Sequence, residues 1–169
     1  MYDSIFNDND MKKLQSLLKK NKASITSAES CTGGLISYLI TQVSGSSEIF
    51  NGGIVTYSND IKHKELNVSK KTLQKHGAVS IEVVNEMLSN VKEKFDANYA
   101  LATSGIAGPN GGSKQKPVGT VIIGFMGPKG SKKVEKYHFF GQRNEVQMQA
   151  AKTALKEILN FLQKTVDKW

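Results

Sequence analysis

The sequence has little of what stabilises small secreted or metal-dependent proteins. It holds one cysteine, Cys31, and three histidines among 169 residues. A single cysteine forms no intrachain disulfide and supplies no cysteine-rich zinc site, which favours a reducing compartment. The histidines lie on three different predicted elements, so the sequence predicts no metal site.

Long apolar runs are also absent. None approaches the ~18 residues of a membrane-spanning helix, and the N-terminal segment is acidic and polar rather than a targeting signal. We therefore expect a cytoplasmic protein without a membrane partner. The composition, with 3 prolines, 38% hydrophobic and 22% charged residues, is typical of a folded globular chain. Its length predicts a single domain over residues 1–169.

Arginine is nearly absent from a basic chain. Lysine and arginine number 23 against 15 acidic residues, a net charge of +8, but Arg143 is the only arginine. Base edges and bidentate phosphate contacts favour a guanidinium group, and the lysines are spread over several predicted helices and turns. We interpret the charge as mainly solvated surface, with weak steering of an anionic small substrate as a second hypothesis. A nucleic-acid partner is not expected.

Apolar periodicity predicts strands that alternate with helices. Strands are predicted over residues 23–28, 52–57, 99–104, 120–125 and 134–140. Helices are predicted over residues 10–20, 35–43, 69–76, 80–95 and 146–162. This order predicts an α/β fold, a three-layer α/β/α sandwich with a mixed, mainly parallel sheet of about five strands. The last two strands form an antiparallel hairpin in this prediction.

Motifs for the common cofactors are missing. The sequence lacks a phosphate-binding P-loop, a dinucleotide-binding glycine fingerprint, an esterase nucleophile elbow and a zinc-protease motif. We therefore predict no cofactor. Two loops rich in small residues, 29–34 and 105–119, remain as candidate sites.

The first loop, Glu29–Gly34, lies between a predicted strand and a predicted helix. Free backbone N–H groups there favour a developing oxyanion, so Ser30 can attack a carbonyl, although a helix N-cap explains the same pattern. Cys31 is more simply a small buried apolar residue than a nucleophile. A serine also needs a base. Tyr57 and Lys62, near the end of the second strand, are candidates, with an ordinary surface lysine as the alternative.

The second loop runs from Gly105 to Gly119 and contains five glycines without periodicity. A loop of this length in a compact domain usually binds a ligand or is disordered. Its amides can approach a phosphate or a ribose closely, and Lys116 adds positive charge. A flexible hairpin loop explains the composition equally well. Arg143, just before the last helix, suits a planar or bidentate contact.

Seven segments follow one another along the chain without large gaps: Ala28–Gly34, Gly45–Ser47, Val55–Asn59 with Lys62, Gly77–Ser80, Ser104–Gly112, Lys116–Val121 and Gly141–Arg143. Together they resemble the C-terminal domain of the competence/damage-inducible protein CinA. Stand-alone members of that family are nicotinamide-nucleotide amidases. The resemblance extends from about Ile25 to the final helix, and several motifs in register are more specific than any one of them.

The resemblance implies a hydrolase that deamidates nicotinamide mononucleotide to nicotinate mononucleotide and ammonia, in pyridine nucleotide salvage, without a metal. It also implies the three-layer fold and a homo-oligomer, a dimer or larger. Carried over by motif, the catalytic residues are Ser30 as nucleophile, assisted by Lys62 and Tyr57. The implied substrate-binding residues are Thr32, Gly33, Ser104, Gly105, Lys116 and Arg143, the last two as candidates for the phosphate.

The chain departs from the family pattern in two ways. Ser104 stands where many relatives have threonine, which keeps a hydroxyl group. Longer relatives carry an N-terminal nucleotide-hydrolase-like domain, whose activity is not expected here. The competing hypothesis is a non-catalytic nucleotide- or partner-binding module linked to competence or DNA damage. It predicts that mononucleotides bind without turnover.

Overall fold

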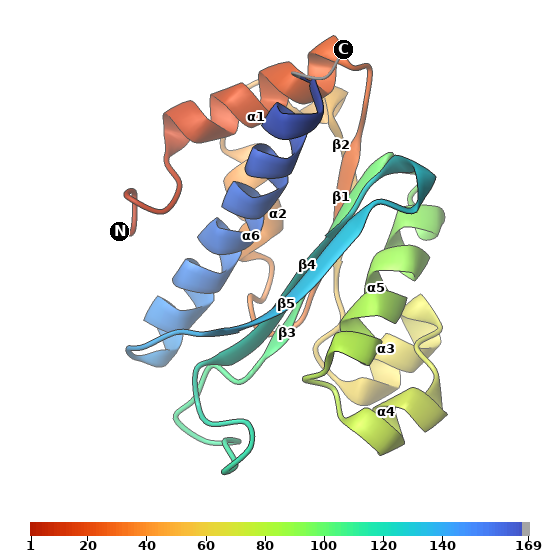
Figure 1. Ribbon diagram of the computed structural model, residues 1–169, viewed down its shortest axis with the longest axis vertical. Coiled ribbons are helices and arrows are strands. Elements are labelled where there is room, and N and C mark those ends of the chain that lie inside the picture. The colour runs from red at the N-terminus through yellow and green to blue at the C-terminus, as the bar shows by residue number, and fades with distance from the viewer. Residues whose placement is uncertain (167–169) are drawn as a thin grey trace.

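The computed structural model describes residues 1–166, and within them one mixed five-stranded sheet forms the centre (Figure 1). The strands are β1 (Ile25–Glu29), β2 (Phe50–Val55), β3 (Tyr99–Gly105), β4 (Thr120–Met126) and β5 (Lys132–His138). Their order across the sheet is β2-β1-β3-β4-β5. β1 is parallel to β2 and β3, whereas β4 is antiparallel to both β3 and β5.

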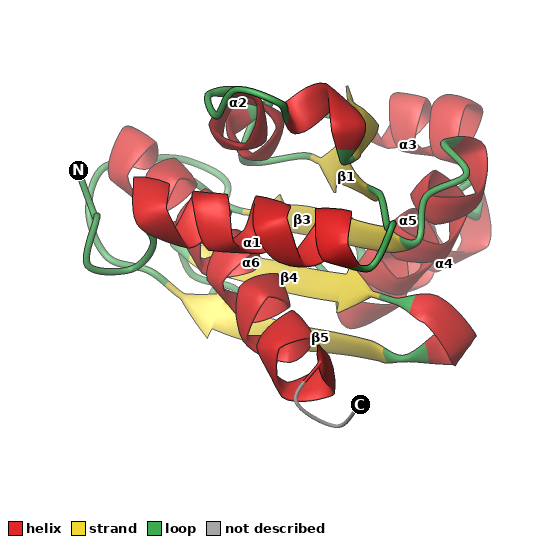
Figure 2. Cartoon of the chain, turned by 90° about the horizontal axis from the view of Figure 1, so that it is seen from above, coloured by secondary structure: helices red, strands yellow, loops and turns green. Residues whose placement is uncertain are grey.

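Helices cover both faces of this sheet (Figure 2). They are α1 (Asp8–Lys20), α2 (Leu35–Thr41), α3 (Asn59–Leu66), α4 (Lys70–His76), α5 (Ile81–Lys94) and α6 (Arg143–Val166). α1, α2 and α6 pack on one face, and α5 packs on the other with α3 and α4 beside it. The predicted three-layer sandwich is thereby confirmed. Within residues 1–166, no helix is long and apolar enough to cross a membrane.

Strand β3 separates the two halves of the core. Its residues from Tyr99 to Ser104 are all buried, and successive side chains point to opposite faces. Leu101 belongs to the apolar cluster formed with α1, α2 and α6, whereas Ala100 and Ala102 belong to the cluster formed with α5. Burial on both faces holds the middle of the sheet firmly, which gives the residues at its end fixed positions.

The parallel strands bring separate segments of the chain to one edge of the sheet. β1, β2 and β3 run in the same direction, and their register pairs Glu29 with both Val55 and Thr103. The residues that follow, including Ser30 and Tyr57, therefore meet beyond this edge. The carboxyl ends of parallel strands are a common place for ligand sites.

The antiparallel part of the sheet is larger than the predicted hairpin. β4 pairs antiparallel with β3 as well as with β5. The connection from β3 to β4 contains no helix, and a parallel return usually needs one. Hydrogen bonds from Ile106 N to Thr120 O and from Gly119 N to Ile106 O, each 2.8 Å, close its base. The loop of residues 107–118 is therefore anchored at both ends.

We expect Gly119→Ala to destabilise the fold far more than Gly130→Ala. Both glycines have a left-handed backbone, with φ of +93° and +75°. A Cβ on Gly119 would collide with the carbonyl oxygen of Phe139, whereas a Cβ on Gly130 meets nothing within 4 Å. Urea unfolding should show a loss of about 1–2 kcal/mol for the Gly130 control, from backbone strain alone. The Gly119 variant should lose roughly 2 kcal/mol more from the collision, and equal losses would contradict this account.

Candidate active site

Ser30 is held at the end of β1 by backbone hydrogen bonds. Its N–H donates to the carbonyl oxygen of Thr103 on β3 at 3.1 Å, which extends the pairing of the two strands by one residue. Its own carbonyl accepts the N–H of Gly33 at 3.0 Å, which turns the chain toward α2. The side chain is 7% exposed and lines a cavity. The hydroxyl is thus fixed in place and open to a small ligand.

Lys62 reaches Ser30 from the first turn of α3. The side chain of Ser58 caps this helix by accepting the N–H of Ile61 at 3.2 Å, which sets where the helix begins. Lys62 is 1% exposed, and its Nζ lies 3.0 Å from Ser30 Oγ. The same amine lies 2.7 Å from the carbonyl oxygen of Thr56 and 3.4 Å from that of Tyr57.

The environment of Lys62 shifts its amine toward the neutral form. Among residues 1–166 it forms no ion pair with a carboxylate. Burial lowers the pKa of its amine from the ordinary 10.5 to about 8. A neutral amine keeps two N–H groups for the carbonyls of Thr56 and Tyr57 and turns its lone pair to Ser30. It can then accept the proton of the Ser30 hydroxyl, as a general base must.

Cys31 has the opposite character. Its side chain is 4% exposed, and burial raises the pKa of its thiol to about 12. A thiol with this pKa stays protonated near neutral pH and is a poor nucleophile. The structure therefore favours the interpretation of Cys31 as a small buried apolar side chain.

The turn after Ser30 offers backbone donors. Within the described residues, the N–H groups of Cys31 and Thr32 make no hydrogen bond to another residue. Paired N–H groups next to a nucleophile are the usual means of stabilising a tetrahedral oxyanion. The turn therefore supplies the Ser30 hydroxyl and, next to it, two candidate N–H donors for the oxyanion that an attack by this hydroxyl would form.

Ser30 and Lys62 open into a cavity of about 250 Å³. Five segments contribute to its wall, namely the turn after β1, the end of β2 with α3, the connection before α5, the end of β3 with the loop that follows it, and the start of α6. The lining residues are Ser30, Cys31, Tyr57, Lys62, Ala78, Val79, Ser104, Gly105, Ile106, Ala107, Gly108, Asn110, Gly111 and Arg143.

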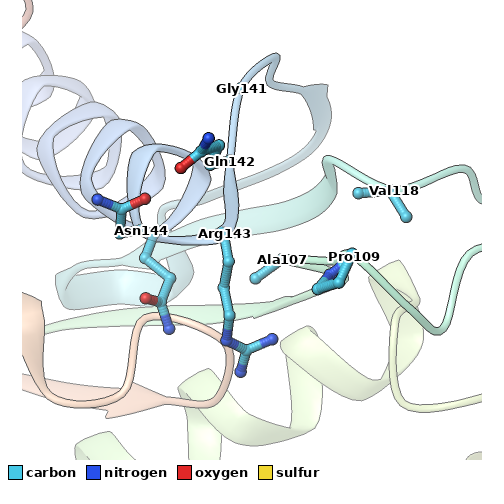
Figure 3. Close-up of a pocket in the computed structure, with 8 residues that line it drawn as sticks. Ala107, Pro109, Val118, Gly141, Gln142, Arg143 and Asn144 are labelled. Carbon is cyan, nitrogen blue, oxygen red and sulfur yellow. The ribbon is translucent and has the colours of Figure 1, made fainter.

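Tyr57 and Arg143 meet at this cavity. The guanidinium group of Arg143 donates to the hydroxyl of Tyr57 through Nη2 and to the carbonyl oxygen of Gly108 through Nη1 at 2.8 Å. Figure 3 shows Arg143 extending from the start of α6 beside Ala107 and Pro109. Arg143 and Ala107 also line a neighbouring groove of about 720 Å³. Arg143 therefore lies between the Ser30 cavity and a larger open space.

The remaining predicted binding residues divide into two groups. Ser104 and Gly105 line the cavity, and the Ser104 hydroxyl donates to the carbonyl oxygen of Ala78 at 2.7 Å. Thr32 and Gly33 are not among its lining residues, and the hydroxyl of Thr32 points into the protein. Their contacts with a substrate stay predictions.

Lys116 does not line the Ser30 cavity. Its Nζ donates to the carbonyl oxygen of His76 at 2.9 Å, at the end of α4. It lines a second cavity of about 250 Å³ together with His76, Glu82 and Lys136. Of the two candidates for a phosphate contact, the structure brings only Arg143 to the reactive pair.

Glu29 lies in the Ala28–Gly34 motif, and no role was predicted for it from the sequence. Its side chain is 0% exposed, and each carboxylate oxygen accepts two hydrogen bonds. The available signal was an acidic residue directly after a predicted strand of small and β-branched residues, because a carboxylate next to a core has to be hydrogen-bonded.

Comparisons with known proteins show what the chain is similar to. The family model described as the CinA C-terminal domain matches residues 7–162. A CinA-like protein of Prochlorococcus marinus (strain MIT 9312) is 52% identical over 136 residues, which are 80% of this chain and 32% of that protein. The chain thus spans about a third of the length of this relative.

A relative of similar length is the nicotinamide-nucleotide amidohydrolase PncC of Enterobacter agglomerans. It is 51% identical over 139 residues, which are 80% of this chain and 85% of that protein. Among solved structures, the competence/damage inducible protein CihA of Agrobacterium tumefaciens aligns with a TM-score of 0.88 and 35% identity. The alignment covers 92% of this chain and 94% of that one.

Because only the neutral amine accepts a proton, we expect the reactivity of Ser30 to depend on the ionisation of Lys62. Labelling by a serine-directed fluorophosphonate should accelerate as the pH rises through about 8, the pKa of the buried Lys62 amine. Lys62→Met should label slowly at every pH and lose this midpoint. Mass spectrometry of the labelled peptide identifies the modified residue. A rate independent of pH between 6 and 10 in the wild type would contradict the assignment of Lys62 as base.

Proposed function

Because the chain belongs to the CinA C-terminal domain family, we propose that it hydrolyses the carboxamide of nicotinamide mononucleotide, giving nicotinate mononucleotide and ammonia. The observation that carries this proposal is the 3.0 Å contact between Ser30 Oγ and the buried amine of Lys62. The 51% identity to a nicotinamide-nucleotide amidohydrolase supports the choice of substrate.

The first half of the reaction forms an ester. Neutral Lys62 accepts the hydroxyl proton of Ser30, and Oγ attacks the carboxamide carbon. The carbonyl oxygen gains negative charge, which the N–H groups of Cys31 and Thr32 stabilise. The Lys62 ammonium then returns the proton to the amide nitrogen, the C–N bond breaks, and ammonia leaves. The acyl group remains on Ser30.

The second half releases the acid. A water molecule gives a proton to the regenerated neutral Lys62 and attacks the ester carbon. The new tetrahedral oxyanion uses the same N–H donors. Collapse breaks the bond to Ser30, the ammonium returns the proton to Oγ, and nicotinate mononucleotide is released. The positive pyridinium ring of the substrate withdraws electrons from the carbonyl carbon in both halves, which lowers the demand on the protein.

The size of the cavity suggests which part of the substrate it holds. A volume of about 250 Å³ suits the nicotinamide ring and part of the ribose rather than a whole mononucleotide with its hydration. The phosphate then extends past Arg143 toward the neighbouring groove. Tyr57 holds the guanidinium group of Arg143 at the boundary between the two spaces. We therefore propose Arg143, and not Lys116, as the phosphate contact.

We expect Ser30→Ala to lower kcat for ammonia release from nicotinamide mononucleotide by at least about a thousandfold, because the nucleophile is removed. Lys62→Met should cause a comparable loss, since Ser30 then lacks its base. Cys31→Ala should retain at least about a tenth of the rate, because the backbone N–H of residue 31 remains. Coupled detection of ammonia measures all three variants.

Three results would count against this mechanism. Normal turnover by both Ser30→Ala and Lys62→Met would exclude the reactive pair. A loss confined to Cys31→Ala would move the nucleophile to the thiol. Binding of nicotinamide mononucleotide in a thermal-shift assay, without ammonia release by the wild type, would favour the non-catalytic nucleotide-binding module.

The phosphate assignment separates two cations that the sequence does not distinguish. Arg143→Gln should raise KM for nicotinamide mononucleotide by roughly 10–100-fold, the effect of losing a charged hydrogen bond. It should raise KM much less for nicotinamide riboside, which has no phosphate. Lys116→Gln serves as the matched control and should leave the ratio of the two KM values unchanged. A larger change of this ratio in the Lys116 variant would reverse the assignment.

A further inference from the structure

The carboxylate of Glu29 accepts hydrogen bonds from the residues that follow Ser30. Its Oε1 accepts the hydroxyl of Thr32 at 2.7 Å and the N–H of Ile36 at 2.9 Å. Its Oε2 accepts the N–H of Ser37 at 3.0 Å and the hydroxyl of Ser37 at 2.9 Å. All four donors follow Ser30 within one short segment, so the side chain ties the end of β1 to the first turn of α2.

The backbone of Glu29 reaches the other half of the reactive pair. Its carbonyl oxygen accepts the N–H of Thr56 at 2.8 Å, and the carbonyl oxygen of Thr56 accepts the amine of Lys62 at 2.7 Å. The side chain of Glu29 fixes the turn that holds Ser30, and the main chain fixes the strand end that holds Lys62. One residue is therefore connected to both partners of the 3.0 Å contact.

The Glu29 network extends into the neighbouring elements. The hydroxyl of Thr32 also lies 2.8 Å from Thr103 Oγ1 on β3, and the hydroxyl of Ser37 lies 3.0 Å from Ser27 Oγ on β1. Buried polar networks with every member bonded hold their parts rigidly. Two backbone N–H groups at the start of α2, with the local helix dipole, also compensate the charge of Glu29.

From these contacts, and resting on the proposed function, we propose that Glu29 is the positioning residue of the Ser30–Lys62 pair. It does not touch the substrate. It holds the turn of residues 30–34 so that the Ser30 hydroxyl meets the Lys62 amine and the N–H groups of residues 31 and 32 remain free for the oxyanion.

Glu29→Gln is the sharpest test because it keeps the shape of the side chain. The N–H groups of Ile36 and Ser37 can only donate, and they use different carboxylate oxygens. Glutamine has one oxygen, so one of these N–H groups must face an NH₂ group. The turn then shifts, and a displacement of reacting groups near 1 Å costs a rate factor of roughly a hundred.

The readout is fluorophosphonate labelling of Ser30, which requires the reactive pair but not the proposed substrate. The folded Glu29→Gln protein should label ~10–100-fold more slowly than wild type, with the midpoint of its pH profile unchanged. Leu14→Ala is the stability control, since Leu14 is fully buried in the cluster with α1 and α6. It should lower Tm while the folded protein labels at the wild-type rate.

A second variant guards against misfolding of the first. Thr32→Val removes one hydroxyl donor to Glu29 but keeps the carboxylate and both backbone bonds, and it should slow labelling by roughly 3–10-fold. Its effect should be less than additive in the double variant with Glu29→Gln, because both act on the same turn. The inference is overturned if folded Glu29→Gln labels at the wild-type rate. If that variant does not fold, normal labelling of Thr32→Val has the same meaning.

The pH profile and the substrate assay separate the remaining explanations. A shifted midpoint in Glu29→Gln would show that the carboxylate acts on the charge of Lys62 rather than on position, which also overturns the inference. A wild type that labels at Ser30 but releases no ammonia from nicotinamide mononucleotide would contradict the proposed substrate and leave the positioning role supported. A wild type that does not label at all would overturn the reactive pair and the inference together.

Discussion

The rest of this site depends on the contact between the buried Lys62 amine and the Ser30 hydroxyl, in which the amine has no counter-ion among residues 1–166. The Lys62 amine donates hydrogen bonds to the carbonyl oxygens of Thr56 and Tyr57 rather than to a carboxylate. Its N–H groups are therefore hydrogen-bonded, while its positive charge is not compensated. Burial of this charge lowers the pKa of the amine to about 8, which leaves a useful neutral fraction at physiological pH. A carboxylate beside Lys62 would stabilise the ammonium form and remove the base. The carboxylate of Glu29 meets this requirement, because it binds the N–H groups at the start of α2 and not the Lys62 amine.

The sheet supplies the precision that such a contact needs. Because β1, β2 and β3 are parallel, the segments after Glu29, Val55 and Gly105 arise from neighbouring strand ends and need no long excursions to meet. The change to antiparallel pairing at β4 has its own consequence. It lets the loop of residues 107–118 fold back over the same edge, where its first residues line the cavity and its base is closed by backbone bonds. A helical crossover at this point would have carried the chain away to a face of the sheet.

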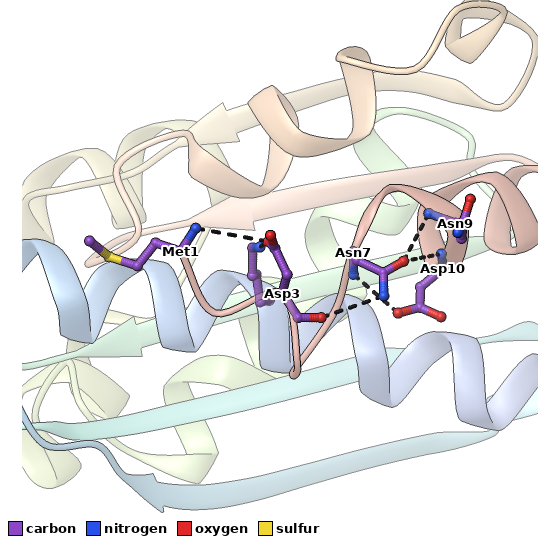
Figure 4. A network of polar contacts seen from close by, with 6 residues as sticks. Met1, Asp3, Asn7, Asn9 and Asp10 are labelled. Carbon is purple, nitrogen blue, oxygen red and sulfur yellow. Dashed lines mark hydrogen bonds and ion pairs between the residues drawn. The ribbon is translucent and has the colours of Figure 1, made fainter.

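Much of the fold was predictable from the local sequence pattern, and the errors of that prediction have physical causes. The predicted start of the first helix was residue 10, among several residues suited to capping. The structure begins α1 at Asp8 because Asn7 accepts the N–H groups of Asn9 and Asp10, and the Asp10 side chain accepts that of Asn7 in return (Figure 4). The second strand was predicted over residues 52–57 but spans Phe50–Val55. The β-branched and aromatic residues at 56 and 57 suit a strand, yet their carbonyls turn to Lys62.

The site was harder to predict, because burial is a property of the assembled layers. The place of Lys62 after the second predicted strand made it a candidate base, but an ordinary surface lysine explained the same residue, and the family resemblance was needed to choose between the two. Lys116 and Arg143 were equivalent as cations near glycines, but the loop turns the first toward the end of α4 while α6 points the second at the cavity. The carboxylate of Glu29 bears on where a phosphate can bind. Since its carboxylate already binds N–H groups at the start of α2, that helix should attract a phosphate only weakly, and in the proposed function the anionic group of the substrate is recognised elsewhere. In that proposal Arg143, which also lines the cavity, contacts the phosphate, and the turn after Ser30 is left for the oxyanion.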